Sequence, residues 1–257
     1  MAENSRNVSV LWKELTAEDL RLRAAGDAIV VLPIASMEQH GPHLPTGVDT
    51  ILCEAVCKAG AERAEGVNVV VAPTLWCGMA EHHMAFGGTF TFDIPLYRAV
   101  LLAFLKSLER HGFKRVLIVN GHGGNMAAMA AFMPDFARET SLRIVGTTYF
   151  ELGQPGMRPF MEDQESVMHA CEVETSMMMA LAPETVKLDR LPEAFGMKVS
   201  DPREVFRPVL SRYRSFRDMS ETGVLGDARR ASAEKGHKFF EACADALAGA
   251  LRDPGIW

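Results

Sequence analysis

The stretch AIVVLPI at residues 28–34 decides the fold class. It is short and continuously apolar, which is typical of a strand buried on both faces of a parallel sheet. Further strands are predicted at residues 68–73, 115–120 and 142–149. Helical patterns separate or follow them, at residues 16–25, 49–63, 94–111, 125–140, 170–181 and 228–252. Strands that alternate with helices predict an α/β fold, with a mostly parallel central sheet flanked by helices on both faces.

The chain is expected to form one domain over residues 1–257. Its 257 residues are 48% hydrophobic and 23% charged, as in an ordinary globular protein. No break in composition marks a linker, and no internal repeat is visible. Residues 182–222 are the least regular part, with several Pro and Arg residues, and are predicted to cover an edge or to contribute to a subunit contact.

Composition also limits the partners. The formal net charge is −6, which gives no electrostatic footprint for nucleic acid. No apolar run reaches the roughly 18–20 residues needed to cross a bilayer, and no secretory signal is visible. The five cysteines are scattered without a Cys-x-x-Cys pair, so neither a zinc finger nor a disulfide scaffold is indicated. We expect a cytoplasmic protein that binds neither nucleic acid nor membrane.

Residues suited to metal binding follow the first predicted strand. Glu38 and His40 are two residues apart, so in an extended chain their side chains point the same way. The loop that follows is rich in Gly and Pro and can bring Asp49 back to them. A bridging Asp with Glu and His on either side is a plausible half of a two-metal site. The alternative is a polar loop in which Asp49 caps a helix.

A second candidate group follows the third predicted strand, in the sequence NGHGGN at residues 120–125. His122 lies among glycines that allow close approach of the main chain to a ligand. A glycine-rich turn between strand and helix also suits a phosphate, but the Lys-Ser/Thr ending of a P-loop is missing. The central histidine favours a metal.

A third group, HACEVETS at residues 169–176, opens a helix rich in Ala and Met. Glu172 and Glu174 lie in an apolar segment, where a buried carboxylate needs a partner. A metal is one such partner, and the positive end of the helix dipole is the other.

Together these segments resemble the creatininase family of amide hydrolases. The match runs from about residue 32 to residue 236, most of the chain, and the ordered set of motifs is very specific. It consists of LPIASMEQHGPHLP at 32–45 with Asp49-Thr50, HMAFGGT at 83–89, NGHGGN at 120–125, HACEVETS at 169–176, and GVLGD at 223–227 with ASAEKG at 231–236.

The resemblance implies a compact α/β sandwich and a cofactor of two divalent metal ions (Zn, Mn or Fe). By match to the motifs, Glu38 and His122 would bind one metal, His40 the other, and Asp49 would bridge. Creatininase proper has a Glu where this chain has Gly124, and branches with the GHGGN form use a Glu of the later motif. Glu172 is therefore predicted to be the last ligand. The missing Glu weakens the case for creatinine itself as substrate.

Two metals lower the pKa of a bound water and supply a hydroxide nucleophile. The predicted function is that of a dinuclear amidohydrolase that cleaves a non-peptide C–N bond, a cyclic amide (lactam) or a formamide, in a small molecule. His169 is the predicted general acid or base, with Glu174 able to share its role. Alternatively, His169 only orients Glu172.

Three further residues are predicted to line the substrate site. The resemblance places His83 near the pocket, and His82 stands where relatives often carry Glu. Trp76 is predicted to form an aromatic wall. The alternative for His82 and His83 is that they are surface residues on a loop. The alternative for Trp76 is that it packs in the core.

Two other functions stay open at this point. One is a peptidase that trims a short peptide, and the other is a non-catalytic binding protein stabilised by metal. The presence of all the proposed ligands argues against the second. The resemblance also implies a closed homo-oligomer, a hexamer or a trimer.

Overall fold

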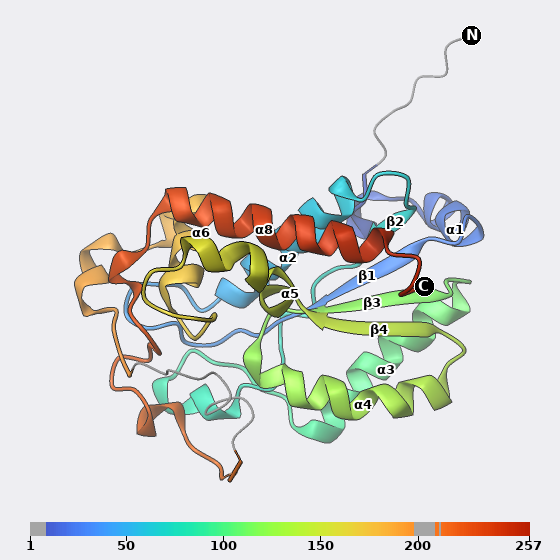
Figure 1. Cartoon of the computed structure of the whole chain (residues 1–257). Coiled ribbons are helices and arrows are strands. Elements are labelled where there is room, and N and C mark those ends of the chain that lie inside the picture. The colour runs from blue at the N-terminus through green and yellow to red at the C-terminus, as the bar shows by residue number, and fades with distance from the viewer. Residues whose placement is uncertain (1–8, 198–208, 211) are drawn as a thin grey trace.

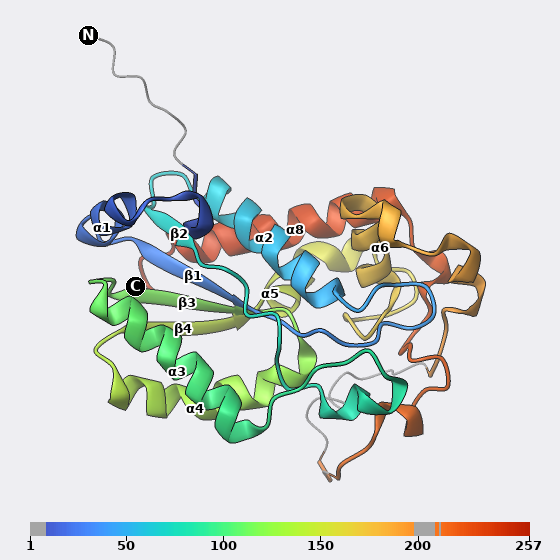
Figure 2. The ribbon, with the colours of Figure 1, turned by 180° about the vertical axis from the view of Figure 1, so that it is seen from behind.

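A parallel four-stranded sheet forms the centre of the computed structural model, which describes residues 9–197, 209–210 and 212–257. The strands β1 (Ile29–Ile34), β2 (Val69–Val71), β3 (Arg115–Asn120) and β4 (Arg143–Thr148) lie in the order β2-β1-β3-β4. Figure 1 shows helices on both sides of this sheet, and Figure 2 shows the same layers from behind. The predicted α/β class is therefore confirmed.

Strand β1 is buried on both faces, because alternate side chains enter two separate cores. Ile29 and Val31 pack into the core beneath α2 (Val48–Arg63) and α8 (Ala233–Arg252). Val30 and Leu32 pack into the other core, beneath α3 (Ile94–Arg110) and α4 (Met126–Glu139). This two-sided burial explains why the strand sequence shows no alternation of polar and apolar residues.

The remaining helices are α1 (Ala17–Ala25), α5 (Tyr149–Met157) and α6 (Glu172–Leu181). Helix α1 begins with a capping box formed by Thr16 and Asp19. Helix α5 was not predicted. It follows β4 without an intervening turn and contains Pro155, a residue that usually ends a helix. Short 3-10 helices lie at Trp12–Glu14, Glu81–Phe86, Gly123–Asn125, Arg158–Phe160, Pro183–Thr185, Leu188–Glu193, Phe216–Asp218 and Ala228–Arg230.

The loops after β1 and β3 leave the sheet at the same edge, because the paired ends Ile34 and Asn120 are in register. Ligands bind at this edge in open parallel sheets. The irregular segment 182–222 lies partly outside the described residues, and its described part includes Phe216, which packs into the core.

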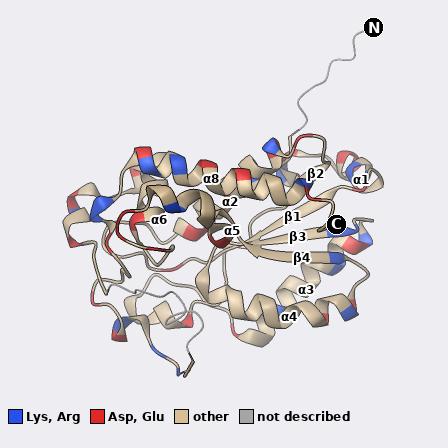
Figure 3. Cartoon of the chain, viewed as in Figure 1, with Lys and Arg blue, Asp and Glu red and all other residues tan. Residues whose placement is uncertain are grey.

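Charged residues of both signs are interspersed along the helices in Figure 3, in keeping with the small net charge. None of the helices in the described ranges is long and apolar enough to cross a membrane.

Candidate metal centre

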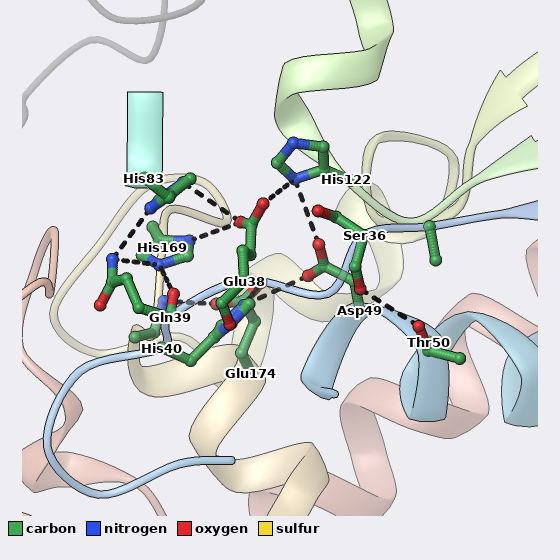
Figure 4. Close-up of polar contacts among 12 residues, drawn as sticks. Ser36, Glu38, Gln39, His40, Asp49, Thr50, His83, His122, His169 and Glu174 are labelled. Atoms are coloured by element: carbon green, nitrogen blue, oxygen red, sulfur yellow. Dashed lines mark hydrogen bonds and ion pairs between the residues drawn. The ribbon is translucent and has the colours of Figure 1, made fainter. Parts of the chain in front are cut away.

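Five polar side chains from four separate segments meet beyond the carboxyl end of the sheet (Figure 4). Glu38 and His40 come from the loop after β1, Asp49 from the first turn of α2, His122 from the loop after β3, and Glu174 from the first turn of α6. Each of these residues is buried. Asp49 lies inside its helix, whose N-cap is Gly47, so the alternative that its carboxylate caps the helix is wrong.

His122 presents a bare ring nitrogen to two carboxylates. Its Nε2 lies 3.1 Å from the carbonyl oxygen of Met79, which can only accept, so Nε2 carries the hydrogen. The Nδ1 lone pair then lies 3.1 Å from Oε2 of Glu38 and 3.1 Å from Oδ2 of Asp49. Three acceptors around one point require a proton or a metal cation between them.

His40 has the same arrangement on the other side of Asp49. Its Nδ1 lies 3.1 Å from the carbonyl oxygen of Glu38, which fixes the hydrogen on Nδ1. The bare Nε2 lies 3.2 Å from Oδ1 of Asp49 and 3.9 Å from Oε1 of Glu174. The two oxygens of Asp49 therefore face two different histidines, as in a bridging carboxylate.

Orphaned polar atoms show that this cluster suits cations. Both carboxylate oxygens of Glu38, Oδ2 of Asp49 and Nε2 of His40 are buried and form no hydrogen bond of normal geometry among the described residues. Buried polar groups without partners are rare in proteins and costly. Carboxylate oxygens and imidazole nitrogens are also ordinary ligands of divalent zinc, manganese and iron. The residues present fit a metal site.

Without cations, burial and mutual repulsion shift the pKa values in this cluster. Burial raises the pKa of Glu174 to about 7, with a further contribution from the nearby Asp49 charge. Burial also raises the pKa of Glu38. Burial lowers the pKa of His40, but the carboxylates of Asp49, Glu174 and Glu38 together outweigh it and bring the value to about 9. Without a metal, His40 therefore takes up a proton at neutral pH, and this proton lies where a cation would otherwise bind.

Two more histidines contact the cluster through Glu38. Nε2 of His83 lies 3.2 Å and Nδ1 of His169 lies 3.5 Å from the same oxygen, Oε1. Phe216 covers both rings, with its centroid 4.2 Å from that of His83 and 4.7 Å from that of His169. Burial lowers the pKa of both imidazoles, so both are neutral at pH 7. The structure thus places His83 beside Glu38.

Glu172 does not join the cluster. Its Oε1 accepts a hydrogen bond of 2.6 Å from Lys235, and its Oε2 accepts from the main-chain N–H groups of Glu162 and Asp163 at 3.1 and 3.0 Å. Residues two positions apart on a helix are rotated by roughly 200°, so the carboxylates of Glu172 and Glu174 face different sides. The structure does not bring Glu172, the predicted fifth ligand, to the cluster; Glu174 faces His40 instead.

The other two predicted pocket residues, His82 and Trp76, lie in different environments. His82 lies beside the centre, with its ring stacked on that of His122 at 5.7 Å. Trp76 is 46% exposed and packs edge-on against Phe90, not against the described imidazoles of the centre. The structure therefore brings His82 to the centre and leaves Trp76 at the surface. The alternative that Trp76 packs in the core is not seen either.

Sequence reasoning assigned no role to Gln39 and Phe216. Gln39 lies between the proposed ligands Glu38 and His40 in the chain, and this position could have indicated a role at the site. Phe216 comes from an irregular segment with no motif, so no signal pointed to it. Both side chains contact His83 and His169 in the folded protein.

Comparisons with known proteins show the family of the chain. The family model for creatininase, described as creatinine amidohydrolase, matches residues 13–251. Creatinine amidohydrolase of Pseudomonas putida is 32% identical over 95% of this chain and 97% of its own. The mycofactocin precursor peptide peptidase of Mycobacterium ulcerans is 30% identical over 93% of this chain and 90% of its own.

A solved mutant creatininase of "Zn-Zn type" superimposes with a TM-score of 0.79 and 30% identity, over 95% of this chain and 98% of its own. The fold is that of a hydrolase that acts on amides. The chain belongs to the creatininase family, and it is an amidohydrolase of that family.

Proposed function

We propose that this protein is a dinuclear metal-dependent amidohydrolase that opens a cyclic amide or cleaves a formamide in a small molecule. The observation that carries the proposal is the position of Asp49, whose two oxygens face the bare nitrogens of His40 and His122. A single metal would leave one of these histidines facing a carboxylate without a cation.

In this proposal, Glu38, Asp49 and His122 hold one divalent ion, and His40, Asp49 and Glu174 hold the other. The donor set suits zinc, manganese or iron, and the name of the related Zn-Zn creatininase supports a pair of ions. When bound, the ions would polarise the substrate carbonyl and activate a water.

His169 is the proposed group that moves the proton to the leaving nitrogen. Its Nε2 lies 2.7 Å from the main-chain oxygen of Gln39 and therefore carries the hydrogen. Its Nδ1 lone pair points to the cluster, next to Oε1 of Glu38. A neutral imidazole with its lone pair toward the reacting centre can take up a proton and return it. Its ring is held by Phe216 and by the contact with the His40 ring at 4.2 Å.

The alternative substrate is a short peptide, and the relationship to the mycofactocin precursor peptide peptidase favours it. The buried ligands and the cover formed by Phe216 favour a small substrate instead. We also propose a homo-oligomer, a hexamer or a trimer, which light scattering of the purified protein would test.

Elemental analysis of the purified protein tests the metal proposal directly. We expect about two divalent ions per chain and the loss of both in Asp49→Ala. The matched control is Asp245→Ala, which removes an exposed carboxylate paired with Arg63 and should retain both ions. One ion in the unaltered protein, or two ions in Asp49→Ala, would contradict the bridging site.

A panel of lactams, formamides and short peptides then tests the reaction. Turnover of a lactam or formamide that requires the metals is the expected result. Release of free amino acids from peptides alone would support the peptidase instead. Full metal content without any turnover would support a metal-stabilised binding protein.

A further inference from the structure

Gln39 connects the two histidines that contact Glu38. Its side chain is buried and its amide has a fixed orientation. Oε1 accepts a hydrogen bond of 2.9 Å from the main-chain N–H of Gly41, and Nε2 donates to the carbonyl of Gly223 at 3.1 Å. Gly223 has a φ of +84°, and a Cβ atom there would lie 2.0 Å from Oε1 of Gln39. Only a glycine therefore allows the amide to occupy this position.

The second hydrogen of the amide has one possible acceptor. Nε2 of Gln39 lies 2.9 Å from Nδ1 of His83 and 3.0 Å from Nε2 of His169. The His169 nitrogen already carries a hydrogen, because it donates to the main-chain oxygen of Gln39 at 2.7 Å. It cannot accept a second one. The remaining amide hydrogen therefore goes to Nδ1 of His83.

This assignment gives the two histidines opposite roles toward one atom. His83 must carry its hydrogen on Nε2, which lies 3.2 Å from Oε1 of Glu38 but not in normal hydrogen-bond geometry. His169 presents its bare Nδ1 to the same oxygen at 3.5 Å. The other oxygen of Glu38, Oε2, faces His122.

We propose that Gln39 is a positioning residue that sets the tautomers of both histidines, that of His169 through its main-chain carbonyl and that of His83 through its side-chain amide. The catalytic consequence rests on the proposed function. The amide places the protonated Nε2 of His83 beside Oε1 of Glu38, and the carbonyl leaves His169 with an unprotonated nitrogen at the reacting centre. Partners that orient metal ligands in this way typically change metal affinity by about 10- to 100-fold.

Nitrogen-15 NMR of histidine-labelled, Zn²⁺-loaded protein tests the tautomers without any substrate. The signals are assigned by removing His83 and His169 one at a time. We expect the His83 hydrogen on Nε2 in the unaltered protein. In Gln39→Met, which has a similar shape but no hydrogen to donate, His83 should populate both tautomers. In Gln39→Glu, the new carboxylate accepts from His83 and should move its hydrogen to Nδ1.

His169 should keep its hydrogen on Nε2 in both variants, because the main-chain carbonyl of residue 39 is unchanged. A purely structural role for Gln39 would not produce this difference between the two histidines. Gln154→Met is the matched control, since that amide also donates to a main-chain carbonyl, of Glu165, but lies outside the metal centre. It should leave both tautomers and the zinc affinity unchanged.

Zinc titration and turnover complete the test. We expect Gln39→Met to bind zinc about 10- to 100-fold more weakly and to lose turnover at saturating zinc by a similar factor. A His83 hydrogen on Nδ1 in the unaltered protein, an unchanged His83 in Gln39→Glu, or full turnover in Gln39→Met would overturn the inference. The expected tautomers together with no turnover of any amide would support the assigned hydrogen bonds and overturn the proposed function instead.

Discussion

Glu172 and Glu174 lie in the first turn of the same helix, but their carboxylates bind groups of different kinds. Glu172 accepts hydrogen bonds from Lys235 and from two main-chain N–H groups. Glu174 accepts from the N–H of Ala170 with Oε2 and directs Oε1 to His40. Ala170 has a φ of +51°, a conformation unusual for a residue with a side chain, and this turn brings its N–H to Glu174.

Glu174→Gln should remove one metal, because an amide oxygen is a weaker ligand than a carboxylate and its charge is lost. We expect elemental analysis to show about one ion per chain in place of two, with turnover reduced by at least about 100-fold. Glu172→Gln is the matched control, two residues away, and should keep two ions. Loss of metal in Glu172→Gln and retention in Glu174→Gln would restore the assignment made from the sequence.

Lys235→Met should destabilise the protein without affecting the metals. Glu172 is fully buried, and the substitution removes the cation that lies 2.6 Å from it. We expect chemical denaturation to show a free energy of unfolding lower by about 1–3 kcal/mol. Lys238→Met, which removes an exposed pair with Glu234, should change it by less than about 0.5 kcal/mol. Equal effects in the two variants would contradict a structural role for the buried pair.

The sequence predicted the sheet and most helices, because strands buried on both faces and helices with capping signals leave local patterns. It also predicted four of the five residues now proposed as ligands, since Glu38, His40, Asp49 and His122 lie in short motifs after strands. The choice of Glu172 over Glu174 as the last ligand rested on the family resemblance, and the residue pattern does not record which side of α6 faces the loop after β1. The roles of Gln39 and Phe216 depend on contacts between distant segments, which no local pattern records.

Gly124→Ala should disrupt the metal centre, although it adds only one methyl group. A Cβ at this position would lie 2.3 Å from Nε2 of His122 and 2.4 Å from the carbonyl oxygen of Met79. It would break the hydrogen bond that fixes the tautomer of His122. We expect zinc affinity, measured by competition with a chelator, to fall by about 10-fold or more.

Gly249→Ala is the control for that variant. A Cβ there meets nothing within 4 Å, and the position lies inside helix α8. Zinc affinity should be unchanged, and the free energy of unfolding should rise by about 0.5–1 kcal/mol, because alanine favours helix more than glycine. Unaltered zinc affinity in Gly124→Ala would show that the His122 contact with Met79 is not needed for metal binding.

Glu38→Gln should have opposite effects on stability with and without metal. In the metal-free protein, Glu38, Asp49 and Glu174 place three buried carboxylates around two histidines, so a neutral amide at position 38 relieves repulsion. We expect thermal denaturation with a chelator to show a higher Tm for the variant, equivalent to about 1 kcal/mol.

With free zinc at about 100 times the Kd, the unaltered protein gains about 2.7 kcal/mol and the variant gains less, so the order of the Tm values should reverse. Ser36→Ala changes a neighbouring buried residue that carries no charge. The Tm of this control relative to the unaltered protein should not reverse between the two conditions. A lower Tm for Glu38→Gln under both conditions would mean that Glu38 stabilises the fold without a metal, and the cluster would then be a polar core network.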